Sequence, residues 1–277
     1  MLLHPKTKDS VNAYIGKPNS TLLIETAGDE LSYSVDLAKH IYSSIAGSSA
    51  DPVLEVQSDK SIGIEAIRDL IHTMSLSANK SDKVSRAAII HDAHLLTREA
   101  QNSLLKLIEE LPSSTQVMLV ASNSNNLFST IKSRCYSISI LPINKSDAAT
   151  YAEKDAIEAS RIDQAYLVSE GKPGLFLRLI ADDEDEYFKS INVAKQYIGS
   201  TVFERQQMAK TITDKKFNLD LFLQSLKVIA KSGLHRSKTT EAKLRWSSTL
   251  EQVLDSKDKI DRNVNKKLAL LELSVHL

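Results

Sequence analysis

Residues 87–112 read AAIIHDAHLLTREAQNSLLKLIEELP, and this stretch decides the fold class. It opens with the apolar run Ala87–Ile90, which is typical of a strand buried in a parallel sheet. Apolar residues then recur at helical spacing from Ala100 to Leu111, and Pro112 follows where a helix should end. A buried strand that leads into an amphipathic helix predicts one unit of an alternating α/β fold.

The same alternation continues on both sides of this stretch. Short apolar runs predict further strands, and segments with one apolar face predict the helices between them. These strands are Thr21–Glu25, Val53–Val56, Val117–Ala121 and Ile138–Leu141, and two of the helices are Val35–Ile45 and Ile64–Met74. Strands that alternate with helices favour right-handed crossovers around a parallel sheet.

The sequence changes in character after Pro142. Short helical patterns follow, and every periodic segment between Tyr187 and Leu277 has helical spacing. The acidic run Asp182–Glu186 is either a domain boundary or the solvated start of a helix. We therefore expect an α/β domain followed by two all-α domains, over residues 1–142, 143–185 and 186–277.

The composition is that of an ordinary globular protein, since 42% of the 277 residues are apolar and 25% are charged. Lys and Arg together number 35, as do Asp and Glu, and this balance excludes a strongly basic protein that binds nucleic acid by itself. The single cysteine, Cys135, excludes an internal disulfide framework and a zinc site built from several cysteines. No apolar segment approaches the roughly 18 residues of a membrane span, so we expect a cytoplasmic protein with no membrane partner.

The stretch quoted above resembles the bacterial DNA polymerase III clamp-loader family of AAA+ ATPases. In that family a Walker B strand leads to a helix with the pattern LTxEAxNALLK, and a sensor strand then leads to a Ser-Arg-Cys motif. Here residues 96–106 read LTREAQNSLLK, and Ser133, Arg134 and Cys135 follow the predicted strand Val117–Ala121. The order and spacing of these independent pieces carry the resemblance.

The resemblance extends over most of the chain. Ser61–Leu70 is similar to the family's helix before Walker B, Gly171–Leu175 to its sensor 2 region, and Asn263–Glu272 to its last collar helix. It implies a parallel-sheet AAA+ domain of the P-loop type with a degenerate P-loop, then a helical lid and a helical collar through which subunits assemble. These parts correspond to the three domains expected above.

The phosphate-binding loop is degenerate. A working loop needs closely spaced glycines, a lysine and a Ser or Thr that holds Mg²⁺. Residues 25–33 read ETAGDELSY, with no lysine; Gly28 is the single glycine, Asp29 is acidic and Ser32 keeps a hydroxyl. A carboxylate about 4 Å from a phosphate charge costs roughly 4 kcal/mol at an effective dielectric constant of about 20. The sequence therefore predicts no nucleotide cofactor in this site.

The end of the Walker B strand is altered as well. The resemblance places His91 and Asp92 where the family has a metal-organising Asp and a water-polarising Glu. A neutral imidazole does not suit Mg²⁺, which prefers oxygen ligands, and Asp92 is one methylene shorter than Glu. The sensor 2 arginine is also missing, because Pro173 and Gly174 occupy its neighbourhood. We therefore predict that this chain has no intrinsic ATPase activity.

The same strand end allows a second interpretation. His91, Asp92 and His94 could form a metal cluster. No further ligand stands nearby in the sequence, so we favour a decayed nucleotide site and expect no metal.

The Ser-Arg-Cys motif is retained although the catalytic residues are not. The resemblance implies that Arg134 is an arginine finger that reaches into the next subunit's nucleotide site. A guanidinium can donate two hydrogen bonds to phosphate oxygens, and fingers supplied in trans raise phosphoryl-transfer rates by roughly 10³–10⁵. Ser133 and Cys135 are expected to position the backbone, and the alternative for Arg134 is a surface arginine paired with a carboxylate.

Two further basic residues are candidates for nucleic-acid contact. Arg98 and Lys106 lie eight residues apart on the predicted helix, which separates them by about 80° around its axis. The resemblance implies that helices of this region touch template phosphates. Thr97 is the expected N-cap, and the free N–H groups of a first helical turn suit a phosphate beside Arg98. A solvated helix face is the alternative for both residues.

The resemblance, together with the lost and retained motifs, implies a delta-prime-like subunit of the DNA polymerase III holoenzyme. Such a subunit would lie beside a gamma/tau-type motor and a delta subunit, supply Arg134 in trans, and help to load the sliding clamp onto primed DNA during replication. Two alternatives stay open. In the first, the chain would be an active motor-type ATPase subunit of the same family. In the second, it would be an adaptor for other DNA-repair or helicase-loading partners.

Overall fold

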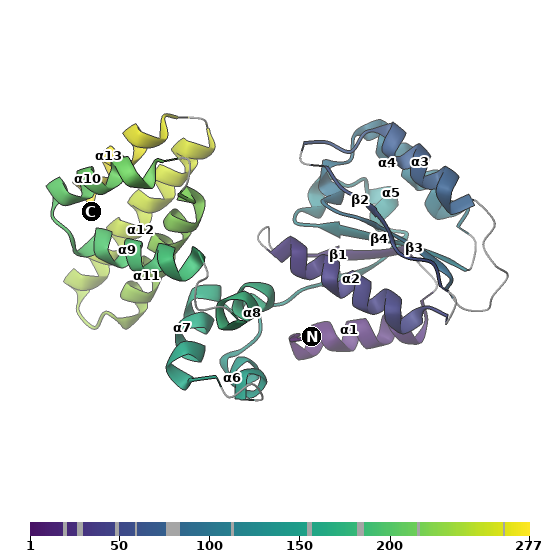
Figure 1. Cartoon of the computed structure of the whole chain (residues 1–277), viewed down its shortest axis with the longest axis horizontal. Coiled ribbons are helices and arrows are strands. Elements are labelled where there is room, and N and C mark those ends of the chain that lie inside the picture. The colour runs from purple at the N-terminus through teal and green to yellow at the C-terminus, as the bar shows by residue number, and fades with distance from the viewer. Residues whose placement is uncertain are drawn as a thin grey trace. The chain divides into compact units, whose positions relative to one another are not determined.

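A parallel sheet of five strands forms the centre of the first of two units in this computed structural model (Figure 1). The structure describes residues 1–18, 21–26, 30–47, 50–58, 60–75, 84–111, 114–153, 157–181, 186–214, 217–262 and 264–277. The strands lie in the order β2-β3-β4-β1-β5, and each neighbouring pair is parallel. Their bounds are β1 Thr21–Glu25, β2 Leu54–Val56, β3 Arg86–Ile90, β4 Thr115–Ala121 and β5 Cys135–Ser139.

The central strands are buried on both faces, as their continuous apolar runs predict. All seven residues of β4 are buried. Its side chains alternate between the two faces, so Leu119 joins one core cluster while Met118 and Val120 join the other. Because all five strands run in the same direction, their carboxyl ends meet at one edge of the sheet and their amino ends at the opposite edge.

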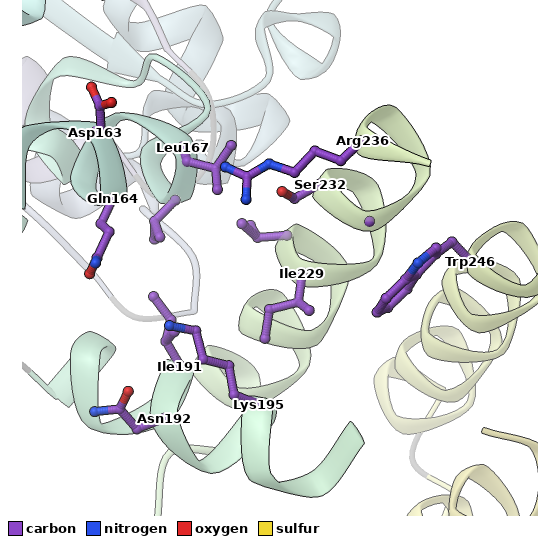
Figure 2. A pocket seen from close by; sticks show the side chains of 13 residues that line it. Asp163, Gln164, Leu167, Ile191, Asn192, Lys195, Ile229, Ser232, Arg236 and Trp246 are labelled. Atoms are coloured by element: carbon purple, nitrogen blue, oxygen red, sulfur yellow. The ribbon is translucent and has the colours of Figure 1, made fainter. Parts of the chain in front are cut away.

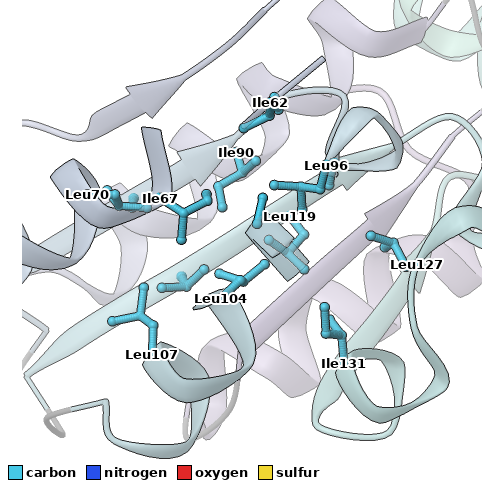
Figure 3. Close-up of a cluster of buried hydrophobic side chains, with 14 of the residues drawn as sticks. Ile62, Ile67, Leu70, Ile90, Leu96, Leu104, Leu107, Leu119, Leu127 and Ile131 are labelled. Carbon is cyan, nitrogen blue, oxygen red and sulfur yellow. The ribbon is translucent and has the colours of Figure 1, made fainter. Parts of the chain in front are cut away.

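Helices cover both faces of this sheet. Their bounds are α1 Pro5–Gly16, α2 Leu31–Ile45, α3 Ile64–Ser75, α4 Arg98–Glu109 and α5 Ser129–Lys132, with 3₁₀ turns at Ala93–Leu95 (η2) and Ser124–Asn126 (η3). On one face, α3, α4 and α5 pack against the strands through Ile67, Leu104 and Ile131 (Figure 3). On the other face, α1 contributes Tyr14 and α2 contributes Ile41 to the second cluster.

The described residues of the second unit are all helical or loop. This unit comprises Ala152–Gly171 and Phe176–Leu277, whereas Lys172–Leu175 belongs to the first unit. The remaining helices are α6 Lys145–Glu153, α7 Ala159–Ser169, α8 Pro173–Ala181, α9 Glu186–Gly199, α10 Val202–Ile212, α11 Leu219–Arg236, α12 Thr240–Asp261 and α13 Lys266–His276. Its core is a cluster on α9 to α13, in which the rings of Tyr197 and Phe222 pack edge to face with centroids 5.3 Å apart.

A cavity of about 540 Å³ opens among α7, α9, α11 and α12 of the second unit (Figure 2). Its lining includes the apolar side chains of Leu167, Ile229 and Trp246. The ring of Trp246 lies against Gly233, where a Cβ atom would stand 2.3 Å from the indole carbons. A glycine is therefore required at this point of α11 for the ring to lie where it does.

The fold class expected from the sequence, an α/β AAA+ domain followed by helical domains, agrees with these elements. Strand bounds differ by up to three residues, as where β5 begins at Cys135 rather than at Ile138, and α1 was not predicted. Pro112 and residues 182–185 of the acidic run lie outside the described residues, and the boundaries at 142 and 185 stay predictions. Within the described part of the chain, no helix has both the length and the apolar character that a membrane span requires.

Candidate functional site

The carboxyl edge of the sheet is the place where open α/β folds bind their ligands. There the chain leaves β1 after Glu25, β3 at His91 and β4 at Ser122. Of the residues predicted for a degenerate nucleotide site, His91 and Asp92 lie at this edge, and Ser32 lies exposed in the first turn of α2. Residues 28 and 29, which are Gly28 and Asp29, lie outside the described residues.

His91 is held by an acidic residue of the neighbouring strand. Its Nε2 atom lies 2.9 Å from Oε2 of Glu55, and Nζ of Lys39 lies 2.8 Å from Oε1 of the same carboxylate. The hydrogen bond from Lys39, and then that from His91, lowers the pKa of Glu55 below its ordinary value. This ion-paired group occupies the strand end where the family places its catalytic carboxylates.

Sequence reasoning missed Glu55 and Lys39. Glu55 comes beside β3 only through the pairing of β2 with β3, in which it is the partner of Ile89. No local pattern sets this register. The acidic residue inside an otherwise apolar strand was the one available signal.

Asp92 begins a separate pair of side chains. Its backbone is left-handed, with φ 45°, a conformation that Asp tolerates better than most residues. Its Oδ1 atom lies 3.7 Å from Nδ1 of His94, which also lies 3.4 Å from Oγ of Ser122. His91 is therefore paired with Glu55 and His94 with Asp92, and among the described side chains no three His, Cys, Asp or Glu groups gather as a metal site.

Glu30 precedes α2 and is buried, with only 2% of the residue exposed. Its Oε2 atom accepts a hydrogen bond from the Gly174 N–H at 2.9 Å, and its Oε1 atom accepts one from the Leu175 N–H at 2.7 Å. These three residues belong to the same unit. Sequence reasoning counted this carboxylate among the charges that oppose nucleotide binding but did not predict its partners.

Arg134 lies at the opposite edge of the sheet, between α5 and the start of β5. Its Nη2 atom lies 3.0 Å from Oε1 of Glu109, and its Nη1 donates to the carbonyl oxygen of Thr130 at 3.1 Å. Both charged side chains are nearly half exposed, at 44% and 46%. The guanidinium is thus positioned by two contacts and remains open to solvent.

The two residues beside Arg134 differ in role. The hydroxyl of Ser133 donates to the carbonyl oxygen of Thr130 at 3.1 Å and lies at the end of α5. Cys135 packs partly buried against the core, and burial raises its thiol pKa to about 12. The thiolate is the reactive form of cysteine, and a raised pKa disfavours it at neutral pH.

Gln101 connects the helix after β3 to the segment that leads to Arg134. It is 3% exposed, and its Nε2 atom donates to the carbonyl oxygens of Leu96 and Asn126 at 3.2 and 3.0 Å. Its Oε1 atom accepts from the Phe128 N–H at 2.8 Å. Sequence reasoning missed Gln101, although a polar residue three positions before Leu104, on the buried face of the helix, was a visible signal.

The candidate nucleic-acid residues lie on the solvent side of α4. Arg98 and Lys106 are both exposed, and neither forms an ion pair within the described part of the chain. The predicted N-cap is confirmed, because Oγ1 of Thr97 accepts from the Ala100 N–H at 3.2 Å. Both cations are therefore available to a ligand, and their contact with nucleic acid stays a prediction.

Comparison with known proteins finds similarity in the first unit. Residues 30–144 match the family described as DNA polymerase III, delta subunit. DNA polymerase III subunit delta' of Escherichia coli is 28% identical over 123 residues, which cover 44% of this chain and 36% of that protein. The delta' subunit of Haemophilus influenzae is 30% identical over 124 residues, which cover 44% and 37%. Part of this chain is thus similar to the delta' subunits of DNA polymerase III.

Proteins with another name also match part of the chain. The replication factor C small subunit of Aeropyrum pernix is 26% identical over 125 residues, covering 43% of this chain and 38% of that protein. Each of these matches spans little more than a third of the relative's length. A DNA polymerase III, gamma subunit-related protein of Thermotoga maritima shares the fold over 97% of both chains, with a TM-score of 0.56 and 19% identity.

Proposed function

We propose that this clamp-loader subunit does not hydrolyse ATP itself and supplies Arg134 in trans to the nucleotide site of an adjacent motor ATPase. The observation that carries this proposal is the position of Arg134. It precedes β5, whose first residue pairs with the first residue of β1, so it lies at the amino edge of the sheet. The degenerate nucleotide site lies at the carboxyl edge, on the order of 15 Å away along the strands. A guanidinium placed there serves a neighbour's site rather than its own.

The surroundings of Arg134 allow its guanidinium to exchange the Glu109 carboxylate for an external phosphate. An exposed ion pair contributes about 0–1 kcal/mol, so Glu109 restrains the guanidinium only weakly. A phosphate that accepts two charge-assisted hydrogen bonds competes favourably with such a carboxylate. The bond to the Thr130 carbonyl oxygen can keep the side chain directed outward during this exchange.

The carboxyl edge supports the absence of hydrolysis. His91 and Lys39 are both engaged by Glu55, and the buried carboxylate of Glu30 lies just before α2, where a P-loop would bind phosphate. Negative charge at this position opposes a polyanionic nucleotide. The described part of this region thus carries three carboxylates, Glu30, Glu55 and Asp92.

The proposed setting is the cytoplasmic replication machinery. The partners are a gamma/tau-type motor subunit, a delta subunit and the sliding clamp, with primed DNA reached through the assembled ring. Arg98 and Lys106 are the residues proposed to meet DNA phosphates, because both are exposed on one helix. Each phosphate contact would add to the salt dependence of DNA binding by the ring.

Reconstitution with the motor subunit, delta, clamp and primed DNA tests the proposal. Arg134→Ala should assemble normally but lower clamp- and DNA-stimulated ATP turnover by about tenfold or more. Arg68→Ala is the matched control, because Arg68 is also an exposed arginine paired with a glutamate, at 2.6 Å from Glu65. Unchanged turnover with Arg134→Ala would refute the finger.

Two further results decide between this proposal and the alternatives. ATP turnover by the isolated chain would identify an active motor-type subunit. Failure of the wild-type chain to enter a ring with the motor subunit would favour an adaptor for other DNA-repair or helicase-loading partners. Both results are obtained with the wild-type chain, so they can be interpreted independently of the Arg134→Ala experiment.

A further inference from the structure

The start of α8 has an unusual N-cap. The first N–H groups of a helix have no partner within the helix, and the residue just before the helix normally accepts them. Here that residue is Lys172, whose ammonium group can donate but cannot accept a hydrogen bond, and Pro173 at the first position has no N–H. The next two N–H groups, of Gly174 and Leu175, donate instead to Glu30, which is 144 residues away from Gly174 in sequence.

The carboxylate of Glu30 lies at the beginning of a second helix as well. It directly precedes α2, which follows β1 in the strand–loop–helix order of a phosphate-binding loop. Helix N-termini favour anions because their free N–H groups and their dipoles are positive. A carboxylate that is 98% buried needs such compensation, and the N–H groups of Gly174 and Leu175 in the first turn of α8 provide it.

The approach of the two segments is too close for any side chain at position 174. A Cβ atom on Gly174 would lie 2.5 Å from Cβ of Tyr33 and 3.0 Å from Oε1 of Glu30. Tyr33 is itself fixed, because its hydroxyl donates to the Leu2 carbonyl oxygen. Glycine at this position therefore allows the N–H groups to reach the carboxylate.

We propose that Glu30 is a built-in anion that replaces a nucleotide phosphate in this unit: it holds the first turn of α8 against the start of α2 and keeps external oxyanions out. Without the Glu30 carboxylate, the N–H groups of Gly174 and Leu175 would form a site for a tetrahedral oxyanion, of which inorganic phosphate is the simplest. This role of Glu30 rests on the proposed loss of nucleotide hydrolysis. It explains how the first turn of α8 stays in contact with the start of α2 when no nucleotide is bound.

Amide hydrogen exchange on the full chain tests the contact directly. In the wild-type protein the Gly174 and Leu175 amides should be protected, although they belong to a first helical turn. Glu30→Gln keeps the shape of the side chain but offers one acceptor instead of two, and it should accelerate exchange at these amides by about tenfold or more. Glu204→Gln is the matched control, because Glu204 receives the Thr201 N–H at 2.8 Å as part of another helix cap.

Gly174→Ala provides a second variant that leaves the carboxylate in place. It should also accelerate exchange at Leu175, since the added Cβ forces α8 away from Tyr33. If the wild-type amides exchange as fast as unprotected ones, or if neither Glu30→Gln nor Gly174→Ala changes their rate, the proposal is wrong.

Phosphate binding tests the second half of the proposal. With Glu30→Ala, millimolar inorganic phosphate should restore protection at Gly174 and Leu175 and raise the Tm, whereas wild-type protein should show neither effect. If Glu30→Ala does not fold without phosphate, folding on addition of phosphate but not of chloride is the expected result. No response of Glu30→Ala to phosphate would overturn the oxyanion site. ATP turnover by the wild-type chain would instead overturn the proposed function, so the two failures are distinguishable.

Discussion

Arg134 and Glu109 are joined by an ion pair at the amino edge of the sheet, where Nη2 of the arginine lies 3.0 Å from Oε1 of the glutamate. Since both side chains are nearly half exposed, we expect a weak coupling between them. A double-mutant cycle with Glu109→Gln and Arg134→Gln, measured by urea unfolding, should give a coupling free energy below about 1 kcal/mol. A coupling energy of several kcal/mol would mean that Glu109 holds Arg134 too firmly for the proposed transfer.

Gln101 should matter more for stability than any exposed residue of α4. Gln101→Leu keeps the side-chain volume but leaves the Leu96 and Asn126 carbonyl oxygens and the Phe128 N–H without their partner. Groups that are buried or partly buried and left unsatisfied in this way should lower the free energy of unfolding by roughly 1–3 kcal/mol. Asn102→Ala, at the exposed neighbouring position, should change it by less than about 0.5 kcal/mol. Equal effects of the two substitutions in urea unfolding would contradict the role given to Gln101.

The sheet could be predicted from the sequence because its central strands are buried on both faces. Continuous apolar runs such as Val117–Ala121 have no other common explanation between helical patterns. The edge strand β5 is different, since four of its five residues are not fully buried and its start at Cys135 carries no apolar run. Helix α1 buries few residues, among them Val11 and Tyr14, which is too sparse a pattern to predict a helix.

The candidate site was predictable where chemistry is local and not where it depends on tertiary contacts. The loss of the P-loop and the retention of Arg134 are visible in short segments. The contacts of Glu30 with Gly174, of His91 with Glu55 and of Arg134 with Glu109 join segments that are distant in the chain. Their partners are set by strand order and helix placement, and no short sequence pattern specifies these.

The Glu55 group should make the first unit sensitive to acid. The pKa of Glu55 is lowered in the folded protein, first by Lys39 and then by His91. Its contribution to stability is therefore complete above its ordinary pKa of 4.5 and is lost as the pH falls through the lowered value. Wild-type protein and Glu55→Gln should accordingly differ in Tm at neutral pH and converge in acid. Lys39→Met removes the first cause of the lowered Glu55 pKa, so in this background the stability contributed by Glu55 should be lost at a higher pH. If the pH at which this stability is lost does not change, Lys39 does not lower the pKa of Glu55.

Trp246 reports on the packing of the helical unit because it is the single tryptophan of the chain. Gly233→Ala would place a methyl group 2.3 Å from its ring carbons, so the indole must move away from α11. We expect a loss of about 1–3 kcal/mol in unfolding free energy, as for other overpacked sites, together with a red shift of the fluorescence as the ring becomes more exposed. Gly199→Ala is the control, since nothing lies within 4 Å of a Cβ at that position and the ring is untouched. If Gly233→Ala left both stability and emission at the wild-type values, the ring of Trp246 could not lie against Gly233, and the wall that it forms in the cavity would have to be redrawn.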